Sequence, residues 1–148
     1  CRAVGLESGF PLIGYRSVAK NLELTADNAE DIAEIVLDTE GHTLDVESST
    51  MRRIREYTDQ VDEITVKAVE AVVERNYDKT IEVRRLFHDI SDREKDILND
   101  LPEMSNKDLL RVREVLVSLQ QTAQYAMRNA EIAANLALNE ENEHVTIK

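Results

Sequence analysis

Two pairs of acidic residues have a spacing that could hold a metal ion. Glu23 and Asp27 are four positions apart, and Asp92 and Asp96 have the same spacing. Side chains four positions apart lie on one face of a helix, where two carboxylates repel each other unless water or a cation separates them. Hard or borderline divalent cations suit such oxygen ligands. These four residues are therefore the candidate metal ligands.

A solvated acidic surface is the competing interpretation of these pairs. The chain has 148 residues, of which 30 are acidic and 18 are basic, so its formal net charge is −12. At this density, acid pairs with the same spacing also arise elsewhere, as at Asp27–Asp31, Glu30–Glu34 and Glu70–Glu74. Spacing alone does not separate a metal site from an acidic face exposed to water.

Catalytic chemistry finds little support in the sequence. A ferritin-like di-iron site uses inward-facing Glu-x-x-His pairs, and only His144 has a glutamate, Glu141, three positions before it. No glycine-rich phosphate loop and no Ser-His-Asp or Cys-His arrangement is recognisable. The single cysteine, Cys1, excludes an intramolecular disulfide. We therefore expect a protein that is not an enzyme.

The acidic balance also narrows the class of partner. Nucleic-acid binding needs a basic patch that neutralises phosphates, and anionic membrane surfaces attract basic segments. No apolar run approaches the roughly 18–20 residues that span a bilayer, and no signal peptide is recognisable. We expect a cytoplasmic chain that inserts in no membrane and binds no nucleic acid through this region. Because the sequence begins at Cys1 without a methionine, we also expect a piece of a longer protein.

The scarcity of turn-forming residues predicts an all-α fold. The chain has four glycines and two prolines, most of them near its start, and no glycine follows Gly41. Strand-rich folds need turn residues about every 8–12 positions, so long helices with few connections are expected. The apolar periodicity predicts an antiparallel bundle of four helices. Their expected bounds are about 12–40, 45–75, 78–101 and 105–138, with a lead-in at 1–11 and a flexible tail at 139–148.

Each of the longer helices has an apolar seam whose steps alternate between three and four residues, as in helices that pack lengthwise. In the first helix, the seam consists of Leu12, Tyr15, Ala19, Leu22, Ala26, Ala29, Ala33 and Val36. In the second it consists of Ile54, Tyr57, Val61, Ile64, Ala68 and Ala71. In the fourth it consists of Leu109, Val112, Leu116, Leu119, Ala123, Ala126, Ala130, Ala133 and Ala137. We expect the first helix to bury its seam by docking onto the other three helices or by pairing with another chain.

The first and fourth helices also repeat each other at an offset of 97 residues. Leu22 matches Leu119, Thr25-Ala26 matches Thr122-Ala123, Ala29 matches Ala126, and Ala33-Glu34-Ile35 matches Ala130-Glu131-Ile132. A duplicated unit is the simplest cause, although two alanine-rich heptad helices can also agree by coincidence.

These features resemble the PhoU family of phosphate-uptake regulators. The family's signature helix, roughly Glu-x-x-Ala-Asp-x-x-x-x-Ile-Ala-Glu, is matched by Glu23, Ala26, Asp27, Ile32, Ala33 and Glu34. Asp92 and Asp96 are similar to the family's other acidic motif, and the segment LQQTAQYAMRNAEIA resembles a second signature. PhoU proteins have two tandem three-helix bundles, so the resemblance over residues 12–138 implies the last four of six helices. Residues 12–40 would end an incomplete first bundle, and residues 42–138 would form the second.

The resemblance implies a function in phosphate homeostasis without catalysis. Such proteins hold down phosphate uptake by contacting the ATPase subunit of the phosphate ABC transporter and, in bacteria, a sensor kinase. The resemblance also implies iron or zinc at the candidate carboxylates. However, Gln120 and Gln124 stand where the second signature would offer Glu and Asp, and amides are poorer, uncharged ligands. We further expect a homodimer.

Two alternatives remain open at this point. One is a metal-binding helical bundle. The other is a sensor or oligomerisation module of an AbrB-like archaeal transcription regulator, because some archaeal proteins carry PhoU-like helices behind a DNA-binding module of that kind.

Overall fold

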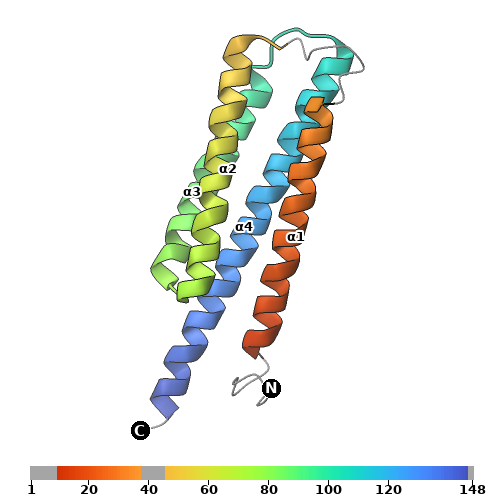
Figure 1. The fold of residues 1–148 in the computed structure, drawn as a ribbon. Coiled ribbons are helices and arrows are strands. Elements are labelled where there is room, and N and C mark those ends of the chain that lie inside the picture. Colours follow the sequence, from red (N-terminus) through yellow and green to blue (C-terminus); the bar gives the residue numbers. More distant parts are fainter. Residues whose placement is uncertain (1–9, 38–45, 147–148) are drawn as a thin grey trace.

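Four helices make up nearly all of the described chain in the computed structural model, which describes residues 10–37 and 46–146 (Figure 1). They are α1 (Phe10–Leu37), α2 (Ser48–Glu74), α3 (Tyr77–Asn99) and α4 (Asn106–Thr146). Consecutive helices run in opposite directions, and the described residues contain no strand. The predicted all-α antiparallel bundle is confirmed. None of the described helices is long and apolar enough to cross a membrane.

Helices α2, α3 and α4 form a three-helix core in which each helix packs against the other two. The seams predicted for α2 and α4 lie at its centre, so the apolar periodicity located the core of these helices correctly. From α2, the buried seam residues are Ile54, Tyr57, Val61, Ile64, Ala68 and Ala71. From α4, they are Val112, Leu116, Leu119, Ala123, Ala126, Ala130 and Ala133. Helix α3 adds Val83, Ile90 and Ile97.

Helix α1 docks antiparallel onto α4, and this is the one described helix whose backbone it approaches closely (Figure 1). Docking onto the other helices was expected, but the face predicted for it is wrong. Most of the predicted seam is exposed, and α1 instead buries Val18 and Asn28 and packs Ile32 and Ile35 against the main core. Valine and isoleucine remove more apolar area from water than alanine does, so the face that carries them gains more by docking.

Helix α3 begins at Tyr77, one residue before the expected start, and Asn76 is its cap. The Asn76 side chain accepts a hydrogen bond from the Lys79 backbone N–H at 3.2 Å. Arg75 adopts the left-handed conformation, with φ 48°, and the Arg75 and Asn76 N–H groups donate to carbonyls in the last turn of α2. This is the Schellman arrangement that ends many helices.

The Arg75 side chain reaches across to α1. Its Nε donates a hydrogen bond to the Tyr15 hydroxyl at 3.1 Å, and its guanidinium carbon lies 6.0 Å from the centroid of the Tyr15 ring. A cation at this distance from an aromatic face is attracted by the ring. The end of α2 is therefore tied to the first turns of α1.

Helix α4 has the predicted start and a later end. The Ser105 hydroxyl accepts a hydrogen bond from the Asp108 backbone N–H at 3.1 Å and donates one to the Asp108 carboxylate at 2.6 Å, so Ser105 caps the start of α4. A tail was expected from residue 139, but the helix continues to Thr146 because residues 139–146 contain neither proline nor glycine. At the other end of the chain, α1 includes Phe10 and Pro11, which were expected to belong to the lead-in.

The repeat between α1 and α4 places matching alanines in opposite environments. Ala126 is 1% exposed within the three-helix core, whereas its counterpart Ala29 lies at the surface of α1. Ala123 and Ala26 differ in the same way, as do Ala130 and Ala33. The two copies of the repeat therefore share a sequence pattern but only the α4 copy is buried by the described helices.

Replacing Ala126 with leucine tests the close packing around α4. Extra methylene groups in a filled core force shifts that cost about 1–3 kcal/mol, so Ala126→Leu should lower the free energy of unfolding by that amount. Ala29→Leu, at the matching exposed position, should change it by no more than about 0.5 kcal/mol. Urea unfolding followed by circular dichroism in dilute solution measures both. Equal effects at the two positions would contradict the packing described for α4.

Candidate functional site

The carboxylates predicted to bind metal all lie on exposed helix faces. Glu23 and Asp27 are exposed on α1, and Glu23 forms an ion pair with Lys20 at 3.0 Å. Asp92 is exposed on α3, where the Lys95 ammonium 2.9 Å away lowers the pKa of its carboxyl group. The exposed Asp96 lines a polar notch of about 210 Å³ between α2 and α3 together with Arg53, Glu56 and Arg93.

The structure does not bring the two acid pairs together. Helix α1 packs against α4 and not against α3, so the pairs lie on helices that make no contact. Within residues 10–37 and 46–146, no three His, Cys, Asp or Glu side chains cluster as metal ligands would. A tetrahedral zinc site takes four ligands, whereas each pair offers two carboxylates. The carboxylates of the described residues therefore form no cluster of three or more ligands, and iron or zinc binding stays a prediction.

The α1–α4 interface carries polar side chains that sequence analysis did not single out. Asn28 is 6% exposed, and its Nδ2 donates to the Ser118 carbonyl at 3.2 Å and to the Thr122 hydroxyl at 3.1 Å. Two turns earlier, the Asn21 Nδ2 donates to Oδ1 of the buried Asn129 at 2.7 Å. Because an unpartnered buried amide is costly, these bonds fix one alignment of α1 along α4. The seven-residue spacing of the two α1 asparagines is the signal that could have identified this face.

Close approach of the two helices at the other end depends on a glycine. A Cβ atom at Gly14 would lie 3.1 Å from Cγ2 of Ile132 and 3.6 Å from a methyl of Leu136. A side chain at this position would therefore require the Ile132 side chain to shift by a few tenths of an ångström. Helices α1 and α4 are thus fitted to each other at both ends of their contact.

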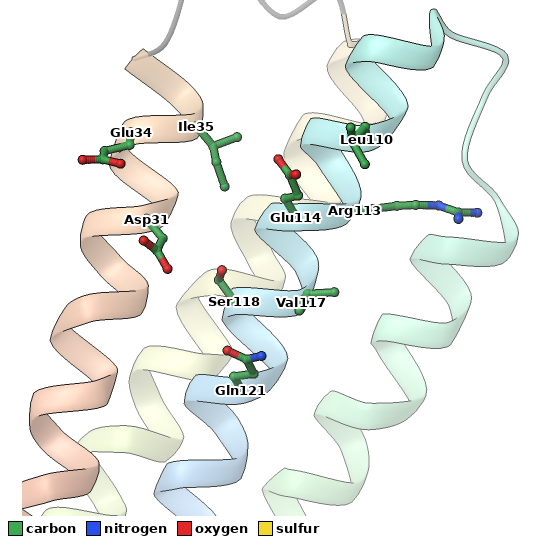
Figure 2. Close-up of a pocket in the computed structure, with 9 residues that line it drawn as sticks. All are labelled: Asp31, Glu34, Ile35, Leu110, Arg113, Glu114, Val117, Ser118 and Gln121. Carbon is green, nitrogen blue, oxygen red and sulfur yellow. The ribbon is translucent and has the colours of Figure 1, made fainter.

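An open groove of about 550 Å³ lies between the C-terminal half of α1 and the N-terminal half of α4 (Figure 2). We call it the α1–α4 groove. It is lined by Asp31, Glu34, Ile35, Leu110, Arg113, Glu114, Val117, Ser118 and Gln121. Sequence analysis missed it, because its two walls are some 75 positions apart in the chain and meet only once the alignment of α1 on α4 is fixed.

The α1–α4 groove combines apolar surface with an acidic rim. Leu110 is 59% exposed and Val117 is 49% exposed, and Ile35 points from α1 toward α4 (Figure 2). Three carboxylates line the groove against one cation, and the side chain of that cation, Arg113, extends away from α1 (Figure 2). Exposed apolar side chains bordered by charge are typical of a surface that binds another protein. The charge favours a partner segment that is basic and partly apolar.

A buried carboxyl group lies inside the three-helix core. Glu94 of α3 is 8% exposed, and its burial raises the pKa of its carboxyl group. Burial and then the charge of Glu94 raise the pKa of Tyr57, whose hydroxyl has no hydrogen-bond partner among the described residues. These groups lie away from the α1–α4 groove, so they affect the stability of the core rather than the groove.

Replacing Asn28 with alanine tests the polar attachment of α1. Asn28→Ala removes two interhelical hydrogen bonds from a buried position and should lower the free energy of unfolding by about 1–3 kcal/mol. Thr25→Ala is the control, because the Thr25 hydroxyl bonds the Asn21 carbonyl of its own helix, and it should cost less. Urea unfolding and hydrogen exchange should show the amides of α1 losing protection before those of α2. Equal losses in the two variants would count against the interhelical role of Asn28.

Replacing Glu94 with glutamine tests the buried carboxyl. Because the folded-state pKa of Glu94 is raised, the stability associated with this group is fully present below its ordinary pKa of 4.5 and is lost as the pH rises through the folded value. Glu94→Gln should therefore stabilise the protein at pH 7, and the gain should shrink as the pH falls toward 4.5. Urea unfolding across this range measures the trend.

Glu82 of the same helix supplies a control of opposite sign. The hydrogen bond from Lys67 lowers the pKa of Glu82, so its ionised form favours folding. Glu82→Gln should therefore weaken the protein slightly at pH 7. If Glu94→Gln also lowers the stability at pH 7, the ionised Glu94 carboxylate is stabilised by its surroundings, and the prediction is wrong.

Comparison with known proteins identifies no relative of this chain. No protein-family model, no curated protein and no solved structure matches it. The resemblance to PhoU proteins therefore rests on the sequence motifs alone, and the function has to be argued from them together with the α1–α4 groove.

Proposed function

We propose that this chain is a non-catalytic regulator of phosphate uptake that acts by binding the ATPase subunit of a phosphate ABC transporter. The observation that carries the proposal is the α1–α4 groove, whose exposed apolar side chains and three carboxylates suit a protein segment. The groove is built by the same two helices that carry the signature-like motifs. Its shape and charge favour regulation by contact over a chemical reaction.

The charge of the chain argues that phosphate itself is not the ligand. The formal net charge is −12, and the α1–α4 groove adds three carboxylates around a single arginine. A field of this sign repels an inorganic anion and attracts a basic surface. The regulator would therefore respond to phosphate through the state of its partner, and a sensor kinase that presents a basic, partly apolar segment would fit the same groove.

The Asn28 and Asn21 hydrogen bonds give the α1–α4 groove a defined shape before a partner arrives. They hold α1 against α4 in one alignment, so both walls of the groove are in place in the free protein. A preformed surface loses less conformational entropy on binding than one that must be assembled. The groove can thus bind a partner without first rearranging α1 on α4.

Binding of the purified ATPase subunit to the full chain tests the proposal. The double variant Glu114→Lys with Val117→Lys places two cations in the α1–α4 groove and should weaken the dissociation constant at least tenfold, about 1.4 kcal/mol. The matched control, Glu131→Lys with Val66→Lys, introduces the same charges at exposed positions outside the groove and should bind as the wild type does. Biolayer interferometry measures all three, and circular dichroism checks the fold of each variant.

Two results would overturn the proposal. A wild-type dissociation constant weaker than about 1 mM would remove the ATPase subunit as the partner. Equal weakening by the groove and control variants would show that net charge, and not the α1–α4 groove, governs the contact.

A further inference from the structure

Helix α1 has an apolar face that no described part of the chain covers. Leu12, Ala19, Ala26 and Ala33 lie at intervals of seven residues on this face and are exposed. Ala29 extends it, as does Val36, which is half exposed and also lines a pocket of about 270 Å³ with residues of α2 and α4. Together these six residues are called the outer stripe. Apolar residues repeating in this way favour lengthwise packing against another helix. Because α1 docks on α4 through a different face, the outer stripe remains available.

The internal repeat shows how the same spacing of apolar residues behaves in α4, where other helices pack against it. The counterparts of Ala19, Ala26 and Ala33 in α4 are Leu116, Ala123 and Ala130, which are at most 1% exposed within the three-helix core. The same spacing therefore serves in α4 as a helix-packing surface. Small side chains in the outer stripe would likewise let a second helix approach α1 closely.

We propose that the outer stripe joins α1 to α1 of a second copy of this chain, with the two helices antiparallel. Of the other exposed large apolar side chains on the described helices, Ile13 and Leu37 lie on α1, and the rest are dispersed over α2, α3 and α4. A second outer stripe is therefore the matching surface that the described chain offers. Two identical stripes related by a twofold axis form a contact that closes as a dimer.

The order of charges along α1 selects the antiparallel arrangement. Beside the outer stripe, the basic residues Arg16 and Lys20 come first, followed by Glu23, which pairs with Lys20 at 3.0 Å, and the second half carries Asp27, Glu30 and Glu34. Antiparallel packing sets the basic half of each copy against the acidic half of its partner. Parallel packing would set like charges together, which is unfavourable between closely packed helices.

One alignment matches the stripe and pairs the two basic residues with acidic ones, while the two copies of Glu23 lie near the twofold axis. It places Leu12 against the partner's Val36 and Ala19 against the partner's Ala29. Arg16 and Lys20 then lie beside the partner's Glu30 and Asp27. The α1–α4 groove involves the opposite side of α1, through Asp31 and Ile35, so the dimer leaves two grooves open. The self-association stands independently of the function proposed for the groove.

Disulfide trapping between two differently labelled chains tests the alignment. In a Cys1→Ser background, one chain carries Ala19→Cys and another carries Ala29→Cys, both at exposed positions. After mild oxidation, the mixture should give a disulfide-linked dimer in much higher yield than either chain alone. Cross-linking of the Ala19→Cys chain by itself would indicate the parallel arrangement and overturn the proposal, as would the absence of cross-linking in the mixture.

The oligomeric state of the wild-type chain supplies a second test. Light scattering during size-exclusion chromatography should show a dimer that Ala26→Glu weakens at least tenfold, because the new carboxylate enters the outer stripe. Ile81→Glu is the control, since Ile81 is exposed on α3, which α1 does not contact, and it should leave the dimer unchanged. Circular dichroism confirms that both variants fold. A wild-type chain that stays monomeric up to about 1 mM, or equal weakening by both variants, would overturn the proposal.

Discussion

Close packing around the alanines of α4 is the constraint on which the positions of the other helices depend. Ala123, Ala126, Ala130 and Ala133 are almost fully buried, and the distance between packed helices is set by the side chains at their contact. Helices α2 and α3 approach α4 on this apolar side. Polar groups on another side, such as Thr122 and Asn129, receive α1.

The sequence predicted the fold of α2, α3 and α4 because apolar and charged residues alternate sharply along them. In α2, the residues between the seam positions are largely charged or polar, so a single face qualifies as the core. Helix α1 differs, because residues suited to packing recur every seven positions on two neighbouring faces. One face carries alanines, and the other carries Asn21 and Asn28. Apolarity alone selects the alanine face, whereas docking selects the face with valine, isoleucine and asparagine. That choice depends on hydrogen-bond partners in α4, which a pattern within one helix does not reveal.

The candidate site could be predicted only where it depends on one helix at a time. A spacing of four places Glu23 beside Asp27 and Asp92 beside Asp96, and the structure keeps each pair on one exposed face. Which helices are neighbours depends on how the bundle packs. Helices α1 and α3 are not neighbours, so the two acid pairs stay apart. The α1–α4 groove was invisible for the same reason, since residues such as Ile35 and Leu110 come together only through the alignment of two distant segments.

The left-handed conformation of Arg75 gives the bundle rigidity at the expense of local strain. An L-residue other than glycine pays about 1–2 kcal/mol for this backbone geometry, and glycine would avoid that cost. Glycine has no side chain, however, and the guanidinium is the group that reaches the Tyr15 hydroxyl and ring. The Arg75 side chain thus fastens the turn between α2 and α3 to a helix some 60 positions earlier in the chain. Fluctuations that swing the start of α1 away from the bundle must first release this fastening.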